Sequence, residues 1–496
     1  SYDDDHYDVE EDLRTYMKGK LKKRKRLNPV RLEVDSNLDA EDKEFLCKNF
    51  EINEKMIFLS KTPFQLGFIF GFIGSLPEKI RKEFSYESFD PQPSAMVNLN
   101  RTIIDQVLEK DIILSYPYES MEPLIRLLDE AATDPNVASI KITLYRIAKD
   151  SKIAQSLIKA SENGKEVIVL MELRARFDED NNIFWSSRLE EAGCKIVYGF
   201  DHYKCHSKVC LITRYGEGDV SFITQIATGN YNEKTAKVYT DFSFMTSDMV
   251  IGQDAKDLFD NILIGNLEGS YEKLMVSPKS MPEGLEKLIK EEIKKAQNGE
   301  DAYIRLKMNS ISDRGLIDLL SKASKAGVEI KMMVRGITCL LPGVNGVTDN
   351  IEIYQIVGRF LEHHRVYQFG REDPKVYISS ADFMTRNIRK RVEVAVPLED
   401  SEIKNYVLGF LDTMFADDVK IRKLSSTGEY LKVENKHNFN AQEELMKKAI
   451  SDNEQRKIQI KENDLANNHK IIKYDAPKKP SEKMSFLDLI RNLFKN

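Results

Sequence analysis

The chain has 496 residues, more than one ordinary hydrophobic core needs, and this length predicts about three domains. Hydrophobic residues make up 41% and charged residues 31%, which is typical of a globular protein and excludes disorder throughout the chain. With 74 Lys+Arg against 80 Asp+Glu, the net charge of −6 does not attract polyanions. Any polyanionic partner must therefore bind a local basic site.

The cysteine usage and the absence of targeting patterns indicate the compartment. Five cysteines occur without a CxxC pair, which suits a reducing environment better than a disulfide scaffold. The longest apolar stretch, residues 64–73, is too short and too glycine-rich to span a bilayer, and no signal-peptide pattern opens the chain. We therefore predict a cytoplasmic protein. The opening SYDDDHYDVEEDL, which begins with Ser, is interpreted as the interior of a longer protein.

The first part of the chain, residues 1–111, carries an acidic start, a basic run and apolar pieces separated by Gly and Pro. The basic run at 18–26 (KGKLKKRKR) could contact a polyanion or act as a nuclear-type signal. A solvated helix face is the favoured interpretation, because charge runs usually stay in water.

A strand–helix–strand pattern begins near residue 138. Residues 140–144 (IKITL) are β-rich, apolar residues then recur at helical spacing up to Gly164, and residues 166–172 (EVIVLME) have a buried-strand pattern. This is a βαβ unit, so a parallel sheet is expected.

The same pattern returns 163 residues later, where Gly327 aligns with Gly164. ASENGKEV (160–167) matches ASKAGVEI (323–330), and the flanking strands match as well. Each half then carries a His-x-basic triplet, His206-Ser207-Lys208 and His363-His364-Arg365. The sequence therefore predicts two α/β domains of like design that each deliver one histidine.

These triplets suit phosphoryl chemistry. Residues i and i+2 of a strand point to one side, so His206 should lie beside Lys208, and His363 beside Arg365. If the halves pack face to face, both pairs converge in one cleft. One neutral imidazole can then attack phosphorus, the other can exchange a proton with the leaving oxygen, and the cations can hold the non-bridging oxygens.

Further phosphate-binding candidates follow the predicted strands. Residues 227–232 (ATGNYN) are small enough for backbone N–H groups to approach an anion, although a plain turn also explains them. Arg146, Arg176 and Arg335 lie after strands, at the carboxyl edge where an open α/β sheet presents residues to ligand. Guanidinium groups there can bind phosphate oxygens bidentately, and surface ion pairing is the alternative.

The tail from residue 464 is rich in Lys and Asn and ends in a short apolar helix at 484–494. Docking or an oligomer contact is favoured over a membrane anchor, and peripheral membrane association is left open.

Several long motifs, in order along the chain, resemble the bacterial polyphosphate kinases. They are TLYRIAKDS (143–151), ELRARFDEDNN (172–182), HSK (206–208), ATGNYNEKTAKVYTDFS (227–243), VRGITCL-PGV (334–344), GRFLEHHRVYQFG (358–370) and ISSADFMTRN (378–387). The resemblance implies two phospholipase D-like α/β catalytic domains behind a truncated α+β head domain. It places the boundaries at 1–111 for the head part, 112–284 and 285–463 for the catalytic domains, and 464–496 for the tail.

The resemblance also implies an activity and residue roles. It implies reversible transfer of the terminal phosphate of ATP to inorganic polyphosphate, with Mg²⁺ and a phosphohistidine intermediate. By position in the motifs, His206 is the phosphorylated nucleophile, and His363, Tyr239 and Arg335 contact the nucleotide. Arg146 and Arg176 are implied at the magnesium site. Because arginine has no lone pair for a cation, they are interpreted as clamps on metal-bound phosphate.

The sequence departs from the family pattern at three places. Leu341 stands where the family usually has Arg, which removes a cation, and His364 replaces a small residue. The family's N-terminal domain, with a nucleotide-contacting Asn, is expected to precede residue 1. We further expect a homo-oligomer and no nucleic-acid partner.

Two other functions remain open. A phospholipase D-type hydrolase of phosphodiesters would be favoured by a second HxK, but the chain has Arg365 at that place. A non-catalytic polyanion-binding scaffold is less favoured, because binding alone requires cations but no paired histidines.

Overall fold

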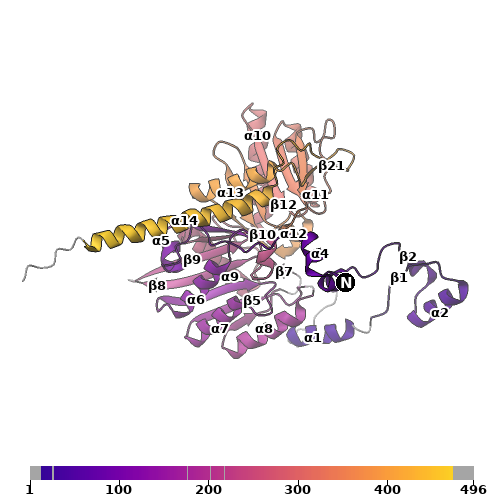
Figure 1. Ribbon diagram of the computed structural model, residues 1–496, viewed down its shortest axis with the longest axis horizontal. Coiled ribbons are helices and arrows are strands. Elements are labelled where there is room, and N and C mark those ends of the chain that lie inside the picture. Colours follow the sequence, from indigo (N-terminus) through magenta and orange to yellow (C-terminus); the bar gives the residue numbers. More distant parts are fainter. Residues whose placement is uncertain (1–12, 25–26, 176, 201–202, 217, 473–496) are drawn as a thin grey trace, which may run out of the picture. The chain divides into compact units, whose positions relative to one another are not determined.

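The structure is a computed structural model that describes residues 13–24, 27–175, 177–200, 203–216 and 218–472. Its helices and strands are labelled in Figure 1. The chain divides into two compact units, residues 1–449 and 450–496, and the first contains both of the large sheets.

The part of the chain before residue 102 forms short elements. They are α1 (Leu13–Arg24), β1 (Leu32–Val34), α2 (Ala40–Phe50), η1 (Glu54–Met56), β2 (Ile57–Leu59), α3 (Phe68–Ser75) and α4 (Glu78–Glu83). On α1, Lys18 is exposed while Met17 packs into the core, as a solvated basic face requires. All side chains of α3 are exposed. Within the described ranges, no helix is both long and apolar enough to cross a bilayer.

The first large sheet and its helices follow. The elements are α5 (Ile103–Glu109), β3 (Ile112–Tyr116), α6 (Glu122–Thr133), β4 (Val137–Leu144), α7 (Lys152–Glu162), β5 (Glu166–Met171), α8 (Glu179–Glu191), β6 (Lys195–Val197), β7 (Lys204–Cys205), β8 (Val209–Gly216), β9 (Asp219–Ala227), η2 (Thr235–Lys237), β10 (Tyr239–Thr246) and α9 (Met249–Leu263).

The second half of the chain contains the second large sheet and its helices, in an order similar to that of the first half. Its elements are β11 (Met275–Val276), α10 (Ser280–Gln297), β12 (Tyr303–Met308), α11 (Arg314–Lys325), β13 (Glu329–Val334), β14 (Ile351–Ile356), β15 (Leu361–Glu362), β16 (Arg365–Phe369), β17 (Lys375–Ser379), α12 (Thr385–Lys390), β18 (Arg391–Val392), β19 (Val394–Pro397), α13 (Ser401–Phe415), β20 (Ile421–Leu424), β21 (Tyr430–Lys432) and α14 (Ala441–Ile472).

The two sheets share one topology. The order β6-β5-β4-β8-β9-β10-β3 corresponds strand for strand to β14-β13-β12-β16-β17-β19-β11. In both, the first three strands are parallel and the remaining pairs are antiparallel. The predicted α/β class and the internal duplication are confirmed.

Local signals set both ends of the helix in each βαβ unit, and the glycines at the helix ends lie where the sequence predicted them. Ser151 caps α7 by accepting from the Ala154 N–H at 3.2 Å, and Asp313 caps α11 by accepting from Leu316 at 3.1 Å. The helices end before Gly164 and Gly327, whose positive φ angles of 79° and 101° suit glycine.

Two short strand pairs join the halves. The segment before His363 forms β15, which pairs with β10 of the first half, and the segment before His206 forms β7, which pairs with β18 of the second half. The apolar cores follow the same plan. One core lies under α6 and α7, a second lies on β12 and β13 with α11, and a third is continuous from Leu211 and Phe244 to Val366 and Val394. The two halves therefore share a hydrophobic interface. This interface and the two strand pairs hold the segments that lead into His206 and His363.

Helix α14 is continuous across residue 464, and residues 473–496, which contain the predicted apolar tail helix, lie outside the described part of the chain. The domain boundaries after residues 111, 284 and 463 remain predictions.

Candidate active site

His206 is held by a carboxylate from the other half. Its Nδ1 lies 2.9 Å from Glu393 Oε2, and the backbone N–H groups of His206 and Ser207 both donate to Val392 O at 2.9 Å. Glu393 already accepts from Ser380 Oγ and Asn387 Nδ2, each at 2.5 Å. Because a carboxylate with these donors is an acceptor, Nδ1 carries the proton and Nε2 keeps its lone pair.

Burial keeps this imidazole neutral. It lowers the pKa of His206 to about 3, against the opposing charge of Glu393, and Lys208 lowers it further. The Tyr145 ring packs edge-on at 4.8 Å between ring centroids. His206 therefore presents an unprotonated, oriented nitrogen near neutral pH.

His363 has the equivalent arrangement in the second half of the site. Its Nδ1 lies 2.8 and 2.9 Å from the two carboxylate oxygens of Asp241, which belongs to the first half. The Tyr239 ring lies 5.3 Å from the imidazole, centroid to centroid. Burial lowers the pKa of His363, and Asp241 counteracts this shift. Each half thus supplies a histidine for one pair and the carboxylate for the other.

The cations of the two triplets lie within electrostatic reach of each other. Lys208 Nζ donates to the carbonyl oxygen of His206, and Arg365 Nη1 donates to that of His363 at 2.9 Å. Burial, together with the charges of Arg365 and Arg391, lowers the pKa of Lys208 to about 7, although Glu393 raises it. Lys208 also lowers the pKa of His363. Lys208 therefore lies close enough to His206, His363 and Arg365 for their charges to interact, and the convergence of both histidines with both cations in one cleft stays a prediction.

Asp382 organises the cations of the second half. It bonds Arg365 Nη2 at 3.1 Å and accepts from the Asn309 N–H at 2.7 Å. The side chain of Asn309 in turn accepts from Arg335 Nε at 2.6 Å. Arg335 follows β13 directly, as predicted. Burial and the nearby charge of Arg365 lower the pKa of Arg335, whereas Tyr239 raises it. Predicted residues Tyr239, Arg335, His363 and Arg365 are thus brought together.

Of the two arginines assigned to magnesium, Arg146 lies among the described residues. Arg146 follows β4 and pairs with Asp178 at 2.9 Å between Nε and Oδ2, whereas Arg176 lies outside the described residues. No group of three or more metal-ligating side chains occurs among the described residues. A guanidinium cannot bind a cation, so the residues present do not fit a magnesium centre held by protein ligands.

The departures from the family pattern have different consequences. Leu341 is exposed, near Gly428 of the β20–β21 turn, and supplies no charge. His364 is buried between the Phe242 and Phe410 rings, so it faces away from the ring of His363.

Sequence reasoning missed the two carboxylates that orient the histidines. Asp241 and Glu393 lie 35 and 30 residues after the histidine of their own half. Each is a buried acid in or beside a strand, and an acidic residue at such a place was an available signal. Which histidine each carboxylate contacts was not readable, because the pairs form across the two halves.

Gly229 makes room for Asp241. A Cβ at this position would lie 2.0 Å from Asp241 Oδ2, so the predicted small residues of 227–232 serve a close approach between side chain and backbone. Thr228 Oγ1 also donates to Asp241 Oδ1 at 2.7 Å. The loop supports the carboxylate of the second pair.

Gly229→Ala should therefore destabilise the protein by about 1–3 kcal/mol, because the methyl group displaces a buried carboxylate. The matched control is Gly409→Ala in α13, where a Cβ meets nothing within 4 Å and where alanine should stabilise by about 0.5–1 kcal/mol. Urea unfolding of both variants measures the difference. Equal stability of the two would contradict the role given to Gly229.

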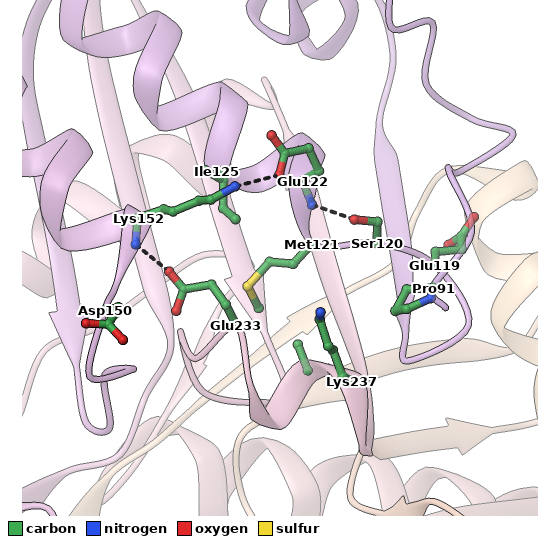
Figure 2. Close-up of a pocket in the computed structure, with 11 residues that line it drawn as sticks. Pro91, Glu119, Ser120, Met121, Glu122, Ile125, Asp150, Lys152, Glu233 and Lys237 are labelled. Atoms are coloured by element: carbon green, nitrogen blue, oxygen red, sulfur yellow. Dashed lines mark hydrogen bonds and ion pairs between the residues drawn. The ribbon is translucent and has the colours of Figure 1, made fainter. Parts of the chain in front are cut away.

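A separate cavity of about 270 Å³ lies near η2 and the first turns of α6 and α7 (Figure 2). Its charged lining is mainly acidic, with Glu119, Glu122, Asp150 and Glu233 against Lys152 and Lys237. Glu233 Oε1 accepts from the Lys152 N–H at 2.8 Å and so caps α7. A net negative lining opposes a polyanion, so this cavity is not suited to bind one.

Two like α/β halves, each giving a histidine to one buried pair and a carboxylate to the other, define a duplicated protein with a histidine-based site at the junction. Comparison with known proteins places this architecture. Sequence models of polyphosphate kinase match residues 2–72 (middle domain), 102–267 (C-terminal domain 1) and 274–442 (C-terminal domain 2). The chain belongs to the polyphosphate kinase family.

Similar proteins agree with this assignment. The chain is 41% identical to a polyphosphate kinase of Staphylococcus haemolyticus over 90% of its own length and 62% of the relative's. It is 39% identical to one of Bacillus cereus over 87% and 61%. The crystal structure of polyphosphate kinase from Porphyromonas gingivalis superposes with a TM-score of 0.78 at 31% identity, over 86% of this chain and 66% of that one. The chain thus spans about three fifths of the length of these curated relatives.

Proposed function

We propose that this chain transfers the terminal phosphate of ATP reversibly to inorganic polyphosphate through a phosphohistidine on His206. The observation that carries the proposal is the His206–Glu393 pair, because it leaves the Nε2 lone pair of a neutral imidazole available, with the buried Lys208 side chain close enough to affect its pKa. Family membership supports the choice of ATP and polyphosphate as substrates.

The proposed reaction has two displacements. His206 Nε2 attacks the γ-phosphorus of ATP, so that the N–P bond forms, the P–O bond to ADP breaks and ADP leaves with the bonding electrons. A terminal polyphosphate oxygen then attacks the phosphohistidine, and the N–P bond breaks to leave a chain longer by one phosphate. Lys208 and Arg365 stabilise charge on the transferred group, and His363 exchanges a proton with the oxygen that leaves or attacks.

In this proposal Tyr239 and Arg335 contact the nucleotide, and Mg²⁺ arrives with its phosphates. Magnesium usually binds through substrate phosphates and water with few protein ligands, and it neutralises charge on the transferred group when bound. Arg146 binds phosphate oxygens after exchanging its partner Asp178, and Arg176 has the same proposed role.

Incubation with ATP labelled at the γ-phosphate tests the function. The label should appear on His206 as an acid-labile, base-stable group and then in an acid-insoluble polymer. Hydrolysis of a phosphodiester without such a polymer would favour the phospholipase D-type alternative, and polyphosphate binding without any labelled protein would favour the scaffold.

Polyphosphate binding should take up protons, because Lys208 with a pKa of about 7 is only partly charged before an anion arrives. A bound phosphate favours the ammonium form, so affinity should rise as pH falls from 8 to 6, with an uptake of up to about half a proton at pH 7. Calorimetry in two buffers with different ionisation enthalpies measures this uptake. Lys208→Arg keeps a permanent charge and should abolish it; an uptake unchanged in that variant would assign the proton elsewhere.

Arg335→Lys should weaken nucleotide use, because an ammonium cannot replace a guanidinium that bonds Asn309 and phosphate together. Loss of one charge-assisted hydrogen bond costs about 1.5–3 kcal/mol, which lowers kcat/KM for ATP roughly tenfold to a hundredfold. Steady-state kinetics measure kcat/KM for ATP in this variant and in the control Arg314→Lys, which changes an exposed arginine on α11. A change below about twofold would place Arg335 outside the site.

A further inference from the structure

The segment 358–362, which leads directly into His363, is fixed by three separate parts of the chain. Arg359 donates to the Glu87 carbonyl oxygen, and the Leu361 N–H donates to Val238 O at 2.9 Å. The third contact comes from α14. Its second residue, Gln442, is buried and bonds the segment through its side-chain amide.

Gln442 pairs with this segment as a neighbouring strand would. Its Oε1 accepts from the Phe360 N–H at 2.9 Å, and its Nε2 donates to Phe360 O at 3.0 Å and to Glu362 Oε1 at 2.6 Å. Gly358 lets the amide come close, because a Cβ there would lie 2.5 Å from Gln442 Oε1.

The bonds continue from Glu362 to the backbone of His363. Thr240 Oγ1 donates to Glu362 Oε2 at 3.0 Å and accepts from the His363 N–H at 3.0 Å. The Thr240 hydroxyl has only one proton, and it is donated to Glu362. His364 Nδ1, which lies 2.8 Å from Thr240 Oγ1, must therefore donate to that oxygen. Lys307 Nζ adds an ion pair to Glu362 at 3.5 Å. Since Asp241 follows Thr240, one network fixes both His363 and its carboxylate partner.

We propose that Gln442 is a positioning residue that holds His363 in register with Asp241 and the cations, so that α14 forms part of the phosphoryl-transfer site. The inference rests on the proposed function for its kinetic consequence but not for its structural one. His206 is held instead by Glu393, whose carboxylate accepts from Ser380 and Asn387, so a change at Gln442 should affect one histidine and leave the other in place.

Gly358→Ala and Gln442→Ala should break the same contact in two ways. The first inserts a methyl group that displaces the flexible amide, and the second removes the amide. In the double variant the methyl group meets no amide, so its defect should be no larger than that of Gln442→Ala alone. Gln106→Ala is the matched control, because Gln106 is also a buried amide, accepting from the Asn98 N–H at 2.7 Å and donating to Asn98 O at 2.9 Å.

The first measurement follows histidine titrations by NMR in the full chain, with His363 assigned from a His363→Gln variant. The groups facing His363 are Asp241 and Tyr239 from β10, Arg365 from β16, and Lys208. Loosening the segment admits water to a ring whose pKa burial lowers, so the pKa of His363 should rise toward its usual range in both single variants. The His206 signals should not move, and Gln106→Ala should change neither.

The second measurement is the kinetics of label transfer to polyphosphate. Both single variants should lower kcat roughly 10- to 100-fold, as misplacement of a reacting group does, with KM changed less than about threefold. The urea midpoint of each variant shows whether its loss of kcat is explained by reduced stability alone. An unmoved His363 titration, strictly additive effects in the double variant, or a kcat loss matched by Gln106→Ala would each overturn the positioning role. Absence of turnover in the unaltered chain would refute the proposed function instead, and the titrations would still decide the role of Gln442.

Discussion

Replacing His206 by alanine should lower phosphoryl transfer by about 10⁴-fold or more and abolish labelling of the protein. His206 is the histidine whose Nε2 is left free by a carboxylate that binds the opposite ring nitrogen. Removing it leaves Lys208 and Arg365 in place, so polyphosphate should still bind while the covalent step is lost.

The experiment compares His206→Ala with His437→Ala, because His437 is exposed and lies outside the histidine–carboxylate pairs. The protein-bound label and the initial rate of polymer formation are measured for both. Label that persists in His206→Ala but disappears in His363→Ala would show that the roles of the two histidines are reversed.

Glu393→Gln should have the second largest effect and lower kcat by about 10²- to 10⁴-fold, as loss of the correct histidine tautomer does in other enzymes. Glu393 accepts from His206, Ser380 and Asn387, and an amide cannot accept through its nitrogen. The substitution also removes the negative charge that raises the pKa of Lys208, so less of the ammonium form remains.

The readout separates orientation from folding. The ¹⁵N chemical shifts of the His206 ring should indicate a mixture of tautomers in the variant in place of the Nδ1–H tautomer alone. Urea unfolding measures how much stability the substitution removes. Glu352→Gln is the control, since Glu352 pairs with Lys423 and Tyr354 on the β14–β20 side of the sheet. A normal rate with an altered tautomer would show that ring orientation does not limit transfer.

Much of the local structure was predictable because its causes are local. The helix from Ser151 to the turn at Gly164 is specified by an N-cap, apolar residues at helical spacing and a glycine with positive φ. The strands β4 and β5 follow from short runs rich in apolar and β-branched residues, and β12 and β13 follow from their alignment with the same units. The duplication followed from the repeat of these patterns in the same order.

Part of the candidate site was also predictable. The two His-x-basic triplets predicted His206, His363 and their cations, and the position of Arg335 directly after a strand predicted that residue. The network from Gln442 through Glu362 to Thr240 was not predictable, because its two links join residues 80 and 122 positions apart. Hydrogen bonds of that kind leave no periodic trace in the sequence.

The α/β class, the two repeated units and the candidate histidines and cations could be predicted from the amino-acid sequence alone, since each depends on spacing along one strand or helix. The tertiary structure decided which carboxylate serves which histidine. Asp241 and Glu393 reach across the junction because β15 pairs with β10 and β7 pairs with β18, so each half completes the other's site. Packing of the shared apolar core helps to set that register, and burial at the same junction lowers the pKa of His206 to about 3, which keeps its imidazole unprotonated near neutral pH.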